Sequence, residues 1–436
     1  MLSASLLGGA MRIASRESMR LHPTEPGFRL PPPDPARAYL LYVHVPFCPV
    51  LCPFCSFHRV ALREAKARRY FPALHRQIEG YAAAGFRLSG VYVGGGTPTA
   101  TPLALFELLS RIRARFGVVP ISVETNPDDL KPEILEPLRA AGVSRLSVGI
   151  QSFDDALLRS MGRYEKYGSG DAIRGRLARV AGQFATLNVD LIFNLPGQTH
   201  ASLERDLGIL RGDGSADQVS YYPLMVTAAT RRAMSGRMGD PTFRREHEFY
   251  RMIRERLADT YAPATAWCFS KRAAAIDEYI VTDDEYLGAG SGAFGYLDGM
   301  FYANTFSLNG YGALANRAGG PVTMYRQMTL RERMRYDLLT RLFGLRLDRT
   351  AIEAKYHGRF ARSLWLELAA LRALGAVTRD PGGWSVTERG MYLWVVLMRE
   401  FLGGVNRFRD QLRLNIQRES IAGVFDGRKS PAMPAL

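Results

Sequence analysis

The sequence has few cysteines, few histidines and no long apolar run, and each scarcity excludes a class of protein. Its 436 residues include only four cysteines and seven histidines, too few for the disulfide framework of a small secreted domain. No stretch of about eighteen consecutive apolar residues occurs, so we expect no transmembrane helix. The start of the chain lacks a charged segment followed by an apolar core, which argues against secretion. These features predict a cytoplasmic protein.

Lysine is also scarce, and nearly all of the positive charge is arginine. The formal net charge is +15, a balance that could favour nucleic acid, an anionic membrane surface or a substrate bearing carboxylates. The arginines are spread along the chain without a polybasic block, so we interpret them as a solvated basic surface and expect no nucleic-acid partner. The length and the 47% hydrophobic content predict a folded protein of about two or three domains.

Three of the four cysteines are concentrated in one short stretch. They form Cys48-Pro-Val-Leu-Cys52-Pro-Phe-Cys55, with the spacing CxxxCxxC, directly after an apolar run at residues 39–47. Thiolates are soft ligands that suit iron–sulfur clusters and zinc. Three thiolates would leave a four-iron cluster with one iron open to a substrate or cofactor. We therefore expect a reactive iron–sulfur site here.

Zinc is the alternative to an iron–sulfur cluster at this stretch. Structural zinc normally has four protein ligands in paired short spacings. The remaining cysteine, Cys268, lies more than two hundred residues away, which leaves His44 and His58 as nearby candidates for a fourth ligand. The spacing favours the cluster and leaves the zinc interpretation open.

From residue 38 onward, short apolar runs rich in β-branched residues alternate with segments of helical period. Strands are predicted at Tyr39–Phe47, Gly90–Val93, Ile121–Glu124, Arg145–Ile150, Leu187–Phe193 and Gln218–Leu224. Helices are predicted at Ala67–Gln77, Ala104–Phe116, Pro132–Ala141, Ala156–Met161, Ala172–Phe184 and Ala201–Leu210. The strands are too continuously apolar for burial on one side, so the pattern predicts a parallel sheet covered by helices. Whether this sheet is open or curled into a partial barrel is not decided by periodicity.

Polar groups follow several of these predicted strands. They are the cysteine stretch, Gly94-Gly-Gly-Thr-Pro-Thr99, Glu124-Thr-Asn126 and Gln151-Ser152, with Asp190 inside the fifth strand. Because the carboxyl ends of parallel strands meet at one edge, these groups should gather there. Parallel α/β folds place their active sites at that edge.

Each polar group has a functional and a structural interpretation. Glycines at 94–96 let a backbone approach a ligand closely, or simply make a tight turn. Glu124 suits ribose hydroxyls but could equally be part of a structural ion pair, and Gln151 and Asp190 are ambiguous in the same way. Arg163 could grip a carboxylate with two hydrogen bonds, or be solvated at a helix end.

Taken together, the motifs resemble those of a known superfamily. They are Tyr42-x-His44-x-Pro46-Phe47-Cys48-xxx-Cys52-xx-Cys55, Gly94-Gly-Gly-Thr-Pro-Thr99, Glu124-Thr-Asn126-Pro127, Ser147-Val-Gly-Ile-Gln151-Ser-Phe153 and Asp190-Leu-Ile-Phe-Asn-Leu-Pro196-Gly-Gln-Thr199. In this order they resemble the radical SAM superfamily, and within it the branch of oxygen-independent coproporphyrinogen III dehydrogenase (HemN-like) proteins. The resemblance covers roughly residues 38 to 400.

The resemblance implies an α/β fold, a partial (β/α)6 TIM-type barrel with a C-terminal helical, winged-helix-like domain. It also implies a [4Fe-4S] cluster held by Cys48, Cys52 and Cys55, with S-adenosylmethionine on the fourth iron. One electron, from a donor such as flavodoxin or ferredoxin, then cleaves the sulfonium to methionine and a 5′-deoxyadenosyl radical that abstracts hydrogen from the substrate.

Motif matching also implies contacts to S-adenosylmethionine. Gly94, Gly95 and Gly96 are expected around its methionine part, and Tyr42 and Thr97 are further expected cofactor contacts. Glu124 is expected at the ribose, and Gln151, Arg163 and Asp190 at the remaining groups. Proteins of this branch can hold a second S-adenosylmethionine, and the segment Gly288-Ala-Gly-Ser-Gly-Ala-Phe-Gly295 matches their late glycine-rich segment, with Gly290 and Gly292 as the expected contacts. A flexible loop is the alternative for this segment.

The chain changes character near residue 329. Thr329-Leu-Arg-Glu332 predicts a capping box that opens a helix to about Leu342. Further helices are predicted near Thr350–Lys355 and Arg362–Leu374, and a hairpin over Gly375–Thr387. We interpret this part as a winged-helix-like lid. The predicted organisation is a leader and Pro-rich linker at 1–37, the core barrel at 38–265, a barrel extension at 266–328 and the C-terminal domain at 329–436.

Departures from the branch's patterns bear on the reaction. Coproporphyrinogen dehydrogenases carry a fourth cysteine two residues after the third ligand, where this chain has Phe57. Haem chaperones (HemW-like) carry HNxxYW before the late glycines, whereas this chain reads Ala275-Ile-Asp-Glu-Tyr279-Ile280. We therefore expect a class C type methyl or alkyl transferase acting on a tetrapyrrole or another conjugated substrate. A coproporphyrinogen dehydrogenase-like decarboxylase and a haem chaperone are the alternatives.

Overall fold

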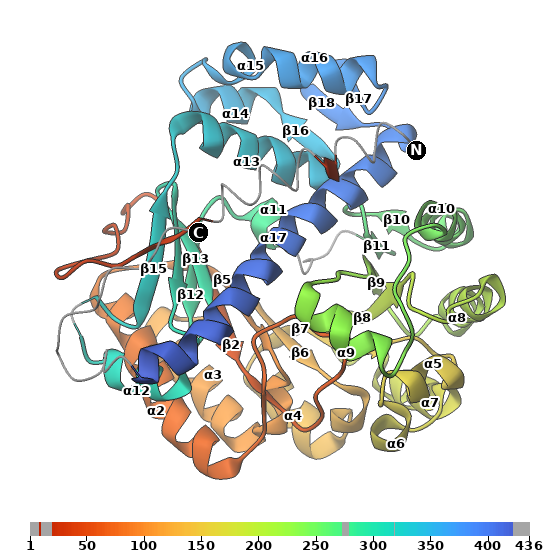
Figure 1. Cartoon of the computed structure of the whole chain (residues 1–436), viewed down its shortest axis with the longest axis horizontal. Coiled ribbons are helices and arrows are strands. Elements are labelled where there is room, and N and C mark those ends of the chain that lie inside the picture. Colours follow the sequence, from red (N-terminus) through yellow and green to blue (C-terminus); the bar gives the residue numbers. More distant parts are fainter. Residues whose placement is uncertain (1–7, 10–19, 273–278, 318, 422–436) are drawn as a thin grey trace.

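The computed structural model describes residues 8–9, 20–272, 279–317 and 319–421 (Figure 1). Two parts of the sequence analysis lie outside the described residues. They are residues 1–7 and 10–19 of the predicted leader, and residues 275–278 of the position expected to carry the chaperone motif.

Six parallel strands form the core of the main sheet. They follow one another in space in sequence order. They are β2 (Tyr39–Val45), β5 (Leu88–Gly95), β6 (Ile121–Thr125), β7 (Val143–Gln151), β8 (Thr186–Phe193) and β9 (Gln218–Pro223). All six predicted strands are confirmed, with ends shifted by a few residues. The first is split, because β2 ends before Pro46 and the chain then pairs as β3 (Phe47–Cys48) with β4 (Val60–Ala61).

Helices connect these strands and lie along the outer side of the arc that the strands make in Figure 1. The predicted helices are found as α2 (Glu64–Ala83), α3 (Pro102–Phe116), α4 (Pro132–Ala140), α5 (Asp155–Ser160), α7 (Gly170–Val180) and α8 (His200–Asp213). The structure adds α6 (Tyr164–Tyr167), α9 (Ala228–Ser235) and α10 (Glu246–Leu257). The apolar faces of the connecting helices are buried, for example at Leu105 and Leu109 of α3 and Leu203 of α8.

The sheet continues beyond both edges of this core. A seventh parallel strand, β12 (Tyr286–Ala289), pairs with β2, so that Gly288 lies opposite Tyr42. Antiparallel strands follow on that side, namely β13 (Phe294–Leu297), β14 (Met300–Asn304), β15 (Val322–Gln327) and β1 (His22–Pro23). On the other side are β11 (Cys268–Ser270) and β10 (Ala262–Pro263). Among the described strands the two edge strands of this 13-stranded sheet, β1 and β10, do not pair with each other, which confirms the α/β partial barrel.

The strand β12 argues against the alternative interpretation of the late glycine-rich segment as a flexible loop. Gly288 lies in β12 and Gly295 in β13, so the segment is a strand, a tight connection and a second strand rather than a flexible loop. Two short helices, α11 (Tyr279–Thr282) and α12 (Leu308–Leu314), flank this region.

A smaller sheet and four helices follow. The capping box at Thr329 and Glu332 is confirmed at the start of α13 (Leu330–Phe343). The other helices are α14 (Arg349–Lys355), α15 (Phe360–Ser363) and α16 (Trp365–Ala373), and the predicted hairpin is β17 (Val377–Asp380) with β18 (Gly383–Val386). The sequence pattern missed β16 (Arg346–Asp348), which pairs with β18, and it missed the break between α15 and α16. Helices with a three-stranded wing fit the expected winged-helix-like unit.

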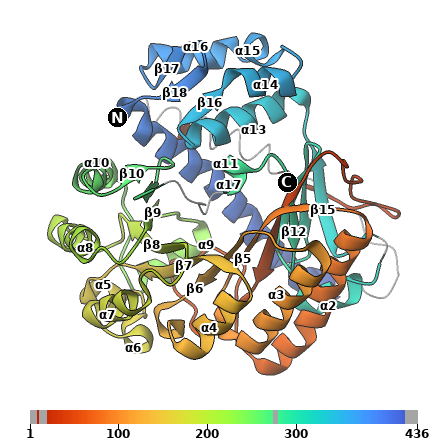
Figure 2. The same cartoon turned by 180° about the vertical axis from the view of Figure 1, so that it is seen from behind.

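The last described helix, α17 (Glu388–Ile421), is 34 residues long. Figures 1 and 2 show it running from the small sheet across the main sheet towards β12 and β13. Arg399 on this helix pairs with the buried Glu246 of α10, which also accepts a hydrogen bond of 2.9 Å from the Tyr392 hydroxyl. Buried charges are stable only when paired in this way. Within the described part of the chain, no helix is both long and apolar enough to cross a membrane.

Candidate active site at the carboxyl edge of the sheet

The cysteine loop is a short excursion from the end of β2. The Val60 N–H donates to the Pro46 carbonyl at 2.8 Å and the Leu62 N–H to the Cys48 carbonyl at 2.9 Å, so β3 and β4 close the base of the loop. Cys48 and Cys52 are buried and Cys55 is half-buried, and all three are free thiols. The strand pair thus holds the loop that carries the three cysteines at the carboxyl edge of the sheet.

The arrangement of the side chains bears on the choice between zinc and a cluster. Among the described residues, no three His, Cys, Asp or Glu side chains converge as they would around one metal ion. Both nearby histidines are engaged elsewhere: His44 Nε2 bonds the His58 carbonyl at 2.7 Å, and His58 Nε2 bonds Ser291 Oγ at 3.3 Å. Neither histidine is therefore placed to be the fourth protein ligand that a structural zinc site would need.

Two of the thiols are connected by a chain of hydrogen bonds that runs through the edge of the sheet. The Thr97 hydroxyl donates to Cys48 Sγ at 3.8 Å and accepts from Asn126 Nδ2 at 2.8 Å. Asn126 Oδ1 accepts from Arg163 Nη2 at 3.0 Å, and Arg163 Nη1 donates to Cys52 Sγ at 3.5 Å. Sequence reasoning quoted Asn126 in a motif but did not assign it to the site. Its position directly after a predicted strand was the signal that could have identified it.

Arg163 is buried, with 4% of its surface exposed, so the alternative of a solvated arginine is excluded. Besides Asn126 and Cys52, it donates to the Gly149 carbonyl, and its guanidinium lies 4.4 Å from the centre of the Tyr167 ring. A guanidinium donates through a rigid fork, so these contacts fix one orientation of the side chain relative to the cysteine loop.

The three consecutive glycines are explained by close approach. A Cβ atom at Gly94 would lie 2.6 Å from Glu124 Oε1, one at Gly95 would lie 2.7 Å from the His44 ring, and one at Gly96 would lie 2.9 Å from Cys48 Sγ. Gly95 also has φ of +120°, which disfavours any side chain. The glycines allow the end of β5 to pack directly against the cysteine loop.

The predicted carboxylates lie on the neighbouring strands. Glu124 accepts from the Tyr92 hydroxyl at 2.9 Å and from the Gly95 N–H at 3.0 Å. Asp190 accepts from Ser147 Oγ and from Asn188 Nδ2, both at 2.8 Å. These hydrogen bonds fix the orientation of both carboxylates on β6 and β8.

Gln151 ends β7 with φ of +78°, a conformation that costs energy in a residue other than glycine. The two residues after it are held by Asp206 of α8, whose carboxylate accepts from Ser152 Oγ and the Phe153 N–H, both at 2.8 Å. Backbone strain of this kind is often found at functional sites. The two hydrogen bonds to Asp206 stabilise the backbone that follows Gln151.

The glycines of the late segment, Gly290 and Gly292, pack against the histidines that flank the cysteine loop. A Cβ at Gly290 would lie 2.4 Å from the His44 carbonyl, and one at Gly292 would lie 2.6 Å from the His58 ring. Tyr42, on the same strand as His44, bonds His44 Nδ1 through its hydroxyl at 2.8 Å. Tyr42, Gly290 and Gly292 are thus packed together beside the loop, with protein atoms against the Cβ side of both glycines.

The electrostatics of the loop depend on burial. Burial, and secondarily the neighbouring Cys55, raises the pKa of the Cys48 thiol to about 12. A metal-ligating cysteine must be deprotonated, so loading this site releases a proton from a thiol that is otherwise held protonated.

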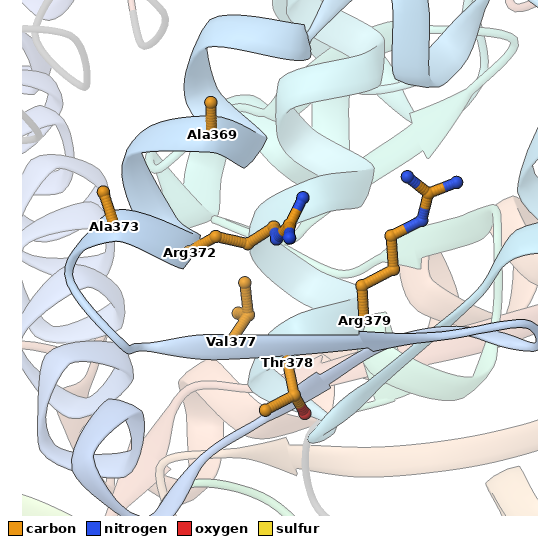
Figure 3. A pocket seen from close by; sticks show the side chains of 6 residues that line it. All are labelled: Ala369, Arg372, Ala373, Val377, Thr378 and Arg379. Carbon is orange, nitrogen blue, oxygen red and sulfur yellow. The ribbon is translucent and has the colours of Figure 1, made fainter.

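Two other features lie away from this edge. Cys268 is buried in β11, which lies beyond β9 in the strand order, on the opposite side from β2. A hollow of about 520 Å³ lies between α16 and β17, where Arg372 and Arg379 border it (Figure 3). None of its lining residues belongs to the strand ends described above, so it is not part of the candidate site.

The buried Asp206 predicts a pH dependence of stability. Burial raises its pKa to about 7, against about 3.9 in an unfolded chain. The folded protein therefore holds a proton that the unfolded chain releases, so stability is highest below pH 4 on this account and falls as the pH rises to about 7. At about 1.4 kcal/mol per pKa unit, the loss is at most about 4 kcal/mol. Asp206→Asn should remove it.

The measurement is the urea midpoint at pH 5 and pH 8 for the wild type and for Asp206→Asn. We expect the wild type to lose stability between these values relative to the variant. The exposed Asp259 provides the matched control, Asp259→Asn. Parallel pH profiles for the wild type and Asp206→Asn would contradict the prediction.

Comparison with known proteins agrees with this geometry. The model for the Radical SAM superfamily matches residues 42–208. The haem chaperone HemW of Bacillus subtilis is 28% identical over 379 residues, covering 83% of this chain and 98% of its own, and HemW of Mycobacterium tuberculosis is 30% identical over 312 residues, covering 68% and 79%. The structure of coproporphyrinogen III oxidase (HemN) from Escherichia coli, described as a radical SAM enzyme, superposes with a TM-score of 0.72 at 26% identity, covering 84% and 91%.

The fold and the cysteine loop are thus those of a radical SAM enzyme, with a [4Fe-4S] cluster and S-adenosylmethionine as cofactors. Within that superfamily, the chain belongs to the HemN-like branch, which includes HemW and HemN.

Proposed function

We propose that the protein modifies a tetrapyrrole or another flat conjugated substrate, and that the reaction is methyl or alkyl transfer of the class C type. One observation carries the substrate class. Phe57, two residues after Cys55, is 47% exposed, and the Arg409 guanidinium lies 5.1 Å from its ring centre and 5.3 Å from that of Phe294. Aromatic rings and a guanidinium plane are the surfaces on which a conjugated ring stacks.

In this proposal the chain's own residues bind and orient the cofactors. Cys48, Cys52 and Cys55 hold the cluster, which together with S-adenosylmethionine supplies one-electron chemistry when bound. The glycines at 94–96 and Thr97 border the cluster, and Tyr42 packs beside them. We propose Glu124 as the ribose partner.

The remaining contacts follow the same edge of the sheet. Gln151, Arg163 and Asp190 are proposed to complete the S-adenosylmethionine site, and Gly290 and Gly292 to border a second molecule. We place the reaction in the cytoplasm, with a flavodoxin- or ferredoxin-type protein as the electron donor. The boundaries at residues 37, 265 and 328 remain our proposal for the domain organisation.

Support for alkyl transfer comes from the sequence around the site. Phe57 replaces the fourth cysteine of the coproporphyrinogen dehydrogenases. The stretch from Ala275 to Ile280, of which residues 275–278 lie outside the described part, lacks the histidine of the chaperone motif. The similarity to HemN favours an oxidative decarboxylase as the second candidate. The similarity to HemW over 98% of its length favours a haem chaperone as the third.

Product analysis distinguishes the two enzymatic candidates. The anaerobically reconstituted protein is incubated with S-adenosylmethionine, a reductant and candidate tetrapyrroles, and the products are identified by mass spectrometry. We expect S-adenosylhomocysteine or methylthioadenosine and an alkylated product beside 5′-deoxyadenosine. Loss of carbon dioxide from the substrate without alkylation would replace our proposal with decarboxylation.

The role of Phe57 can be tested in the same assay. Phe57→Ala should raise the KM for the substrate about tenfold, because an aromatic contact contributes about 0.5–1.5 kcal/mol beyond the apolar area it buries. Leu51 lies on the same loop and is 44% exposed, so Leu51→Ala is the matched control. Equal KM values for the two variants would remove Phe57 from the substrate site.

A further inference from the structure

The backbone of the cysteine loop is held by two arginines, one next to the loop in sequence and one far along the chain. Arg59 Nη2 donates to the Cys52 carbonyl at 2.5 Å and to the Cys55 carbonyl at 2.9 Å. Arg413 Nη2 donates to the Ser56 carbonyl at 3.0 Å and also to the Phe57 carbonyl. Arg59 belongs to the loop's own return strand region, whereas Arg413 lies on α17, 357 residues after Ser56. The C-terminal helix therefore contacts the segment that carries the cysteines.

Neighbouring side chains on α17 fix the orientation of Arg413 and of Arg409. Arg413 Nη1 donates to Asp410 Oδ1 at 2.8 Å, and Arg409 Nη1 donates to Asn406 Oδ1 at 2.7 Å. Each guanidinium is thus oriented by a polar side chain three residues before it on the same helix. Phe408 packs against Phe294 of β13, with ring centres 6.0 Å apart. This part of α17 is consequently fixed against both the loop and the sheet.

The loop itself has little regular structure to hold it. Between Cys52 and Phe57 the backbone makes one turn, closed by the Cys55 N–H and the Cys52 carbonyl at 3.3 Å. Unpaired carbonyls in such a segment would be satisfied by water and would leave it free to move. Hydrogen bonds from charged donors are stronger than those from neutral ones, so the two guanidiniums restrict it most effectively.

We propose that Arg413 is a positioning residue for the cluster site: α17 fixes the part of the cysteine loop after Cys55, while Arg59 fixes the part before it. Each arginine binds a different part of the loop backbone, so we expect the loss of either one to increase the motion of the part that it binds. The inference rests on the proposed role of the three cysteines as cluster ligands, and it does not depend on the reaction that follows.

A reciprocal effect follows from thermodynamic linkage. If α17 stabilises the loop geometry that holds the cluster, then the cluster must stabilise the docked position of α17 by the same free energy. Loading the site should therefore slow amide exchange in α17 around residues 405–413, a region that contributes no cluster ligand.

The test compares Arg413→Ala, Arg413→Lys and Arg389→Ala. Arg389 is exposed at the start of the same helix, so its variant controls for the loss of one positive charge. The readouts are hydrogen–deuterium exchange of residues 52–59 in the full-length protein before and after loading, and the rate of iron loss to a chelator without oxygen. For Arg413→Ala we expect exchange and iron loss about tenfold faster than in the wild type, because two charge-assisted hydrogen bonds are lost. The effect is smaller than for buried bonds of this kind, since one of the two is partly buried and the other is exposed, and water weakens both. Arg413→Lys should be intermediate, since an ammonium keeps the charge but lacks the fork.

Wild-type rates in Arg413→Ala would overturn the proposal, as would equal acceleration in Arg389→Ala. The unmodified protein gives a second test that does not depend on how the variants fold: exchange in residues 405–413 that is unchanged by cluster loading would also overturn it. Neither readout involves the substrate. A failure here would therefore leave the proposed reaction standing, and an absence of product would leave the role of Arg413 standing.

Discussion

Cys48→Ala, Cys52→Ala and Cys55→Ala should each abolish assembly of the cluster, so that about four irons per chain in the wild type fall to near zero. Each thiolate would be one of three ligands to the cluster, and the two nearby histidines cannot take its place, because His44 and His58 are engaged with a backbone carbonyl and a serine hydroxyl. The measurement is iron and sulfide content together with the charge-transfer absorption after anaerobic reconstitution.

Cys268→Ala is the matched control, since this thiol is buried in β11 on the far side of the sheet core. It should assemble the cluster like the wild type. Stoichiometric zinc in the wild type, without charge-transfer absorption after reconstitution, would contradict the cluster assignment.

Arg163→Ala should retain the cluster but form 5′-deoxyadenosine about a hundredfold more slowly. Arg163 connects Cys52 Sγ, Asn126 Oδ1 and the Gly149 carbonyl, so its removal leaves buried acceptors without their donor and releases the orientation of the strand ends. Each hydrogen bond from a charged donor is worth about 1.5–3 kcal/mol, so the loss of two is enough to slow the reaction about a hundredfold. The measurement is the rate of 5′-deoxyadenosine formation at matched iron content.

Arg159→Ala is the control for this variant. Arg159 is close in sequence but half-exposed, and its guanidinium lies over the Tyr164 ring at 3.7 Å. It should cleave S-adenosylmethionine at the wild-type rate. An Arg163→Ala protein with full iron and an unchanged rate would mean that Arg163 serves stability alone.

The core of the fold could be predicted because one physical rule covers it. Strands buried on both faces must be apolar throughout, and the helices that cover them must have one apolar stripe, so β2 and β5 to β9 and their helices are visible in the sequence. The strands β12 to β15 were missed because their segment is rich in glycine and aromatic residues, which is also typical of loops. The first of them, β12, pairs with β2, a contact between residues more than two hundred positions apart, and β13, β14 and β15 then pair in series from β12 outward.

The site was predicted in part for a similar reason. Residues that follow a predicted strand must lie at the carboxyl edge, which placed Thr97, Glu124 and Gln151 without a structure. The same rule places Asn126 at this edge, but its bonds to Thr97 and Arg163 became visible only from the structure, as did the role of Asp206. Arg413 is the extreme case, since its partner is 357 residues away.

The measurement that tests the central claim most directly is the consumption of S-adenosylmethionine with and without a candidate tetrapyrrole, combined with a haem titration followed by absorbance. We predict that a substrate accelerates formation of 5′-deoxyadenosine, because a bound substrate excludes water and places its reacting carbon close to the site. We also predict no stoichiometric haem complex with axial imidazole ligation, since the position of the chaperone motif lacks its histidine and the two histidines near the cysteine loop, His44 and His58, are buried and hydrogen-bonded. A tight one-to-one haem complex that transfers haem to an acceptor protein, with no turnover of S-adenosylmethionine, would contradict the account and identify a chaperone instead.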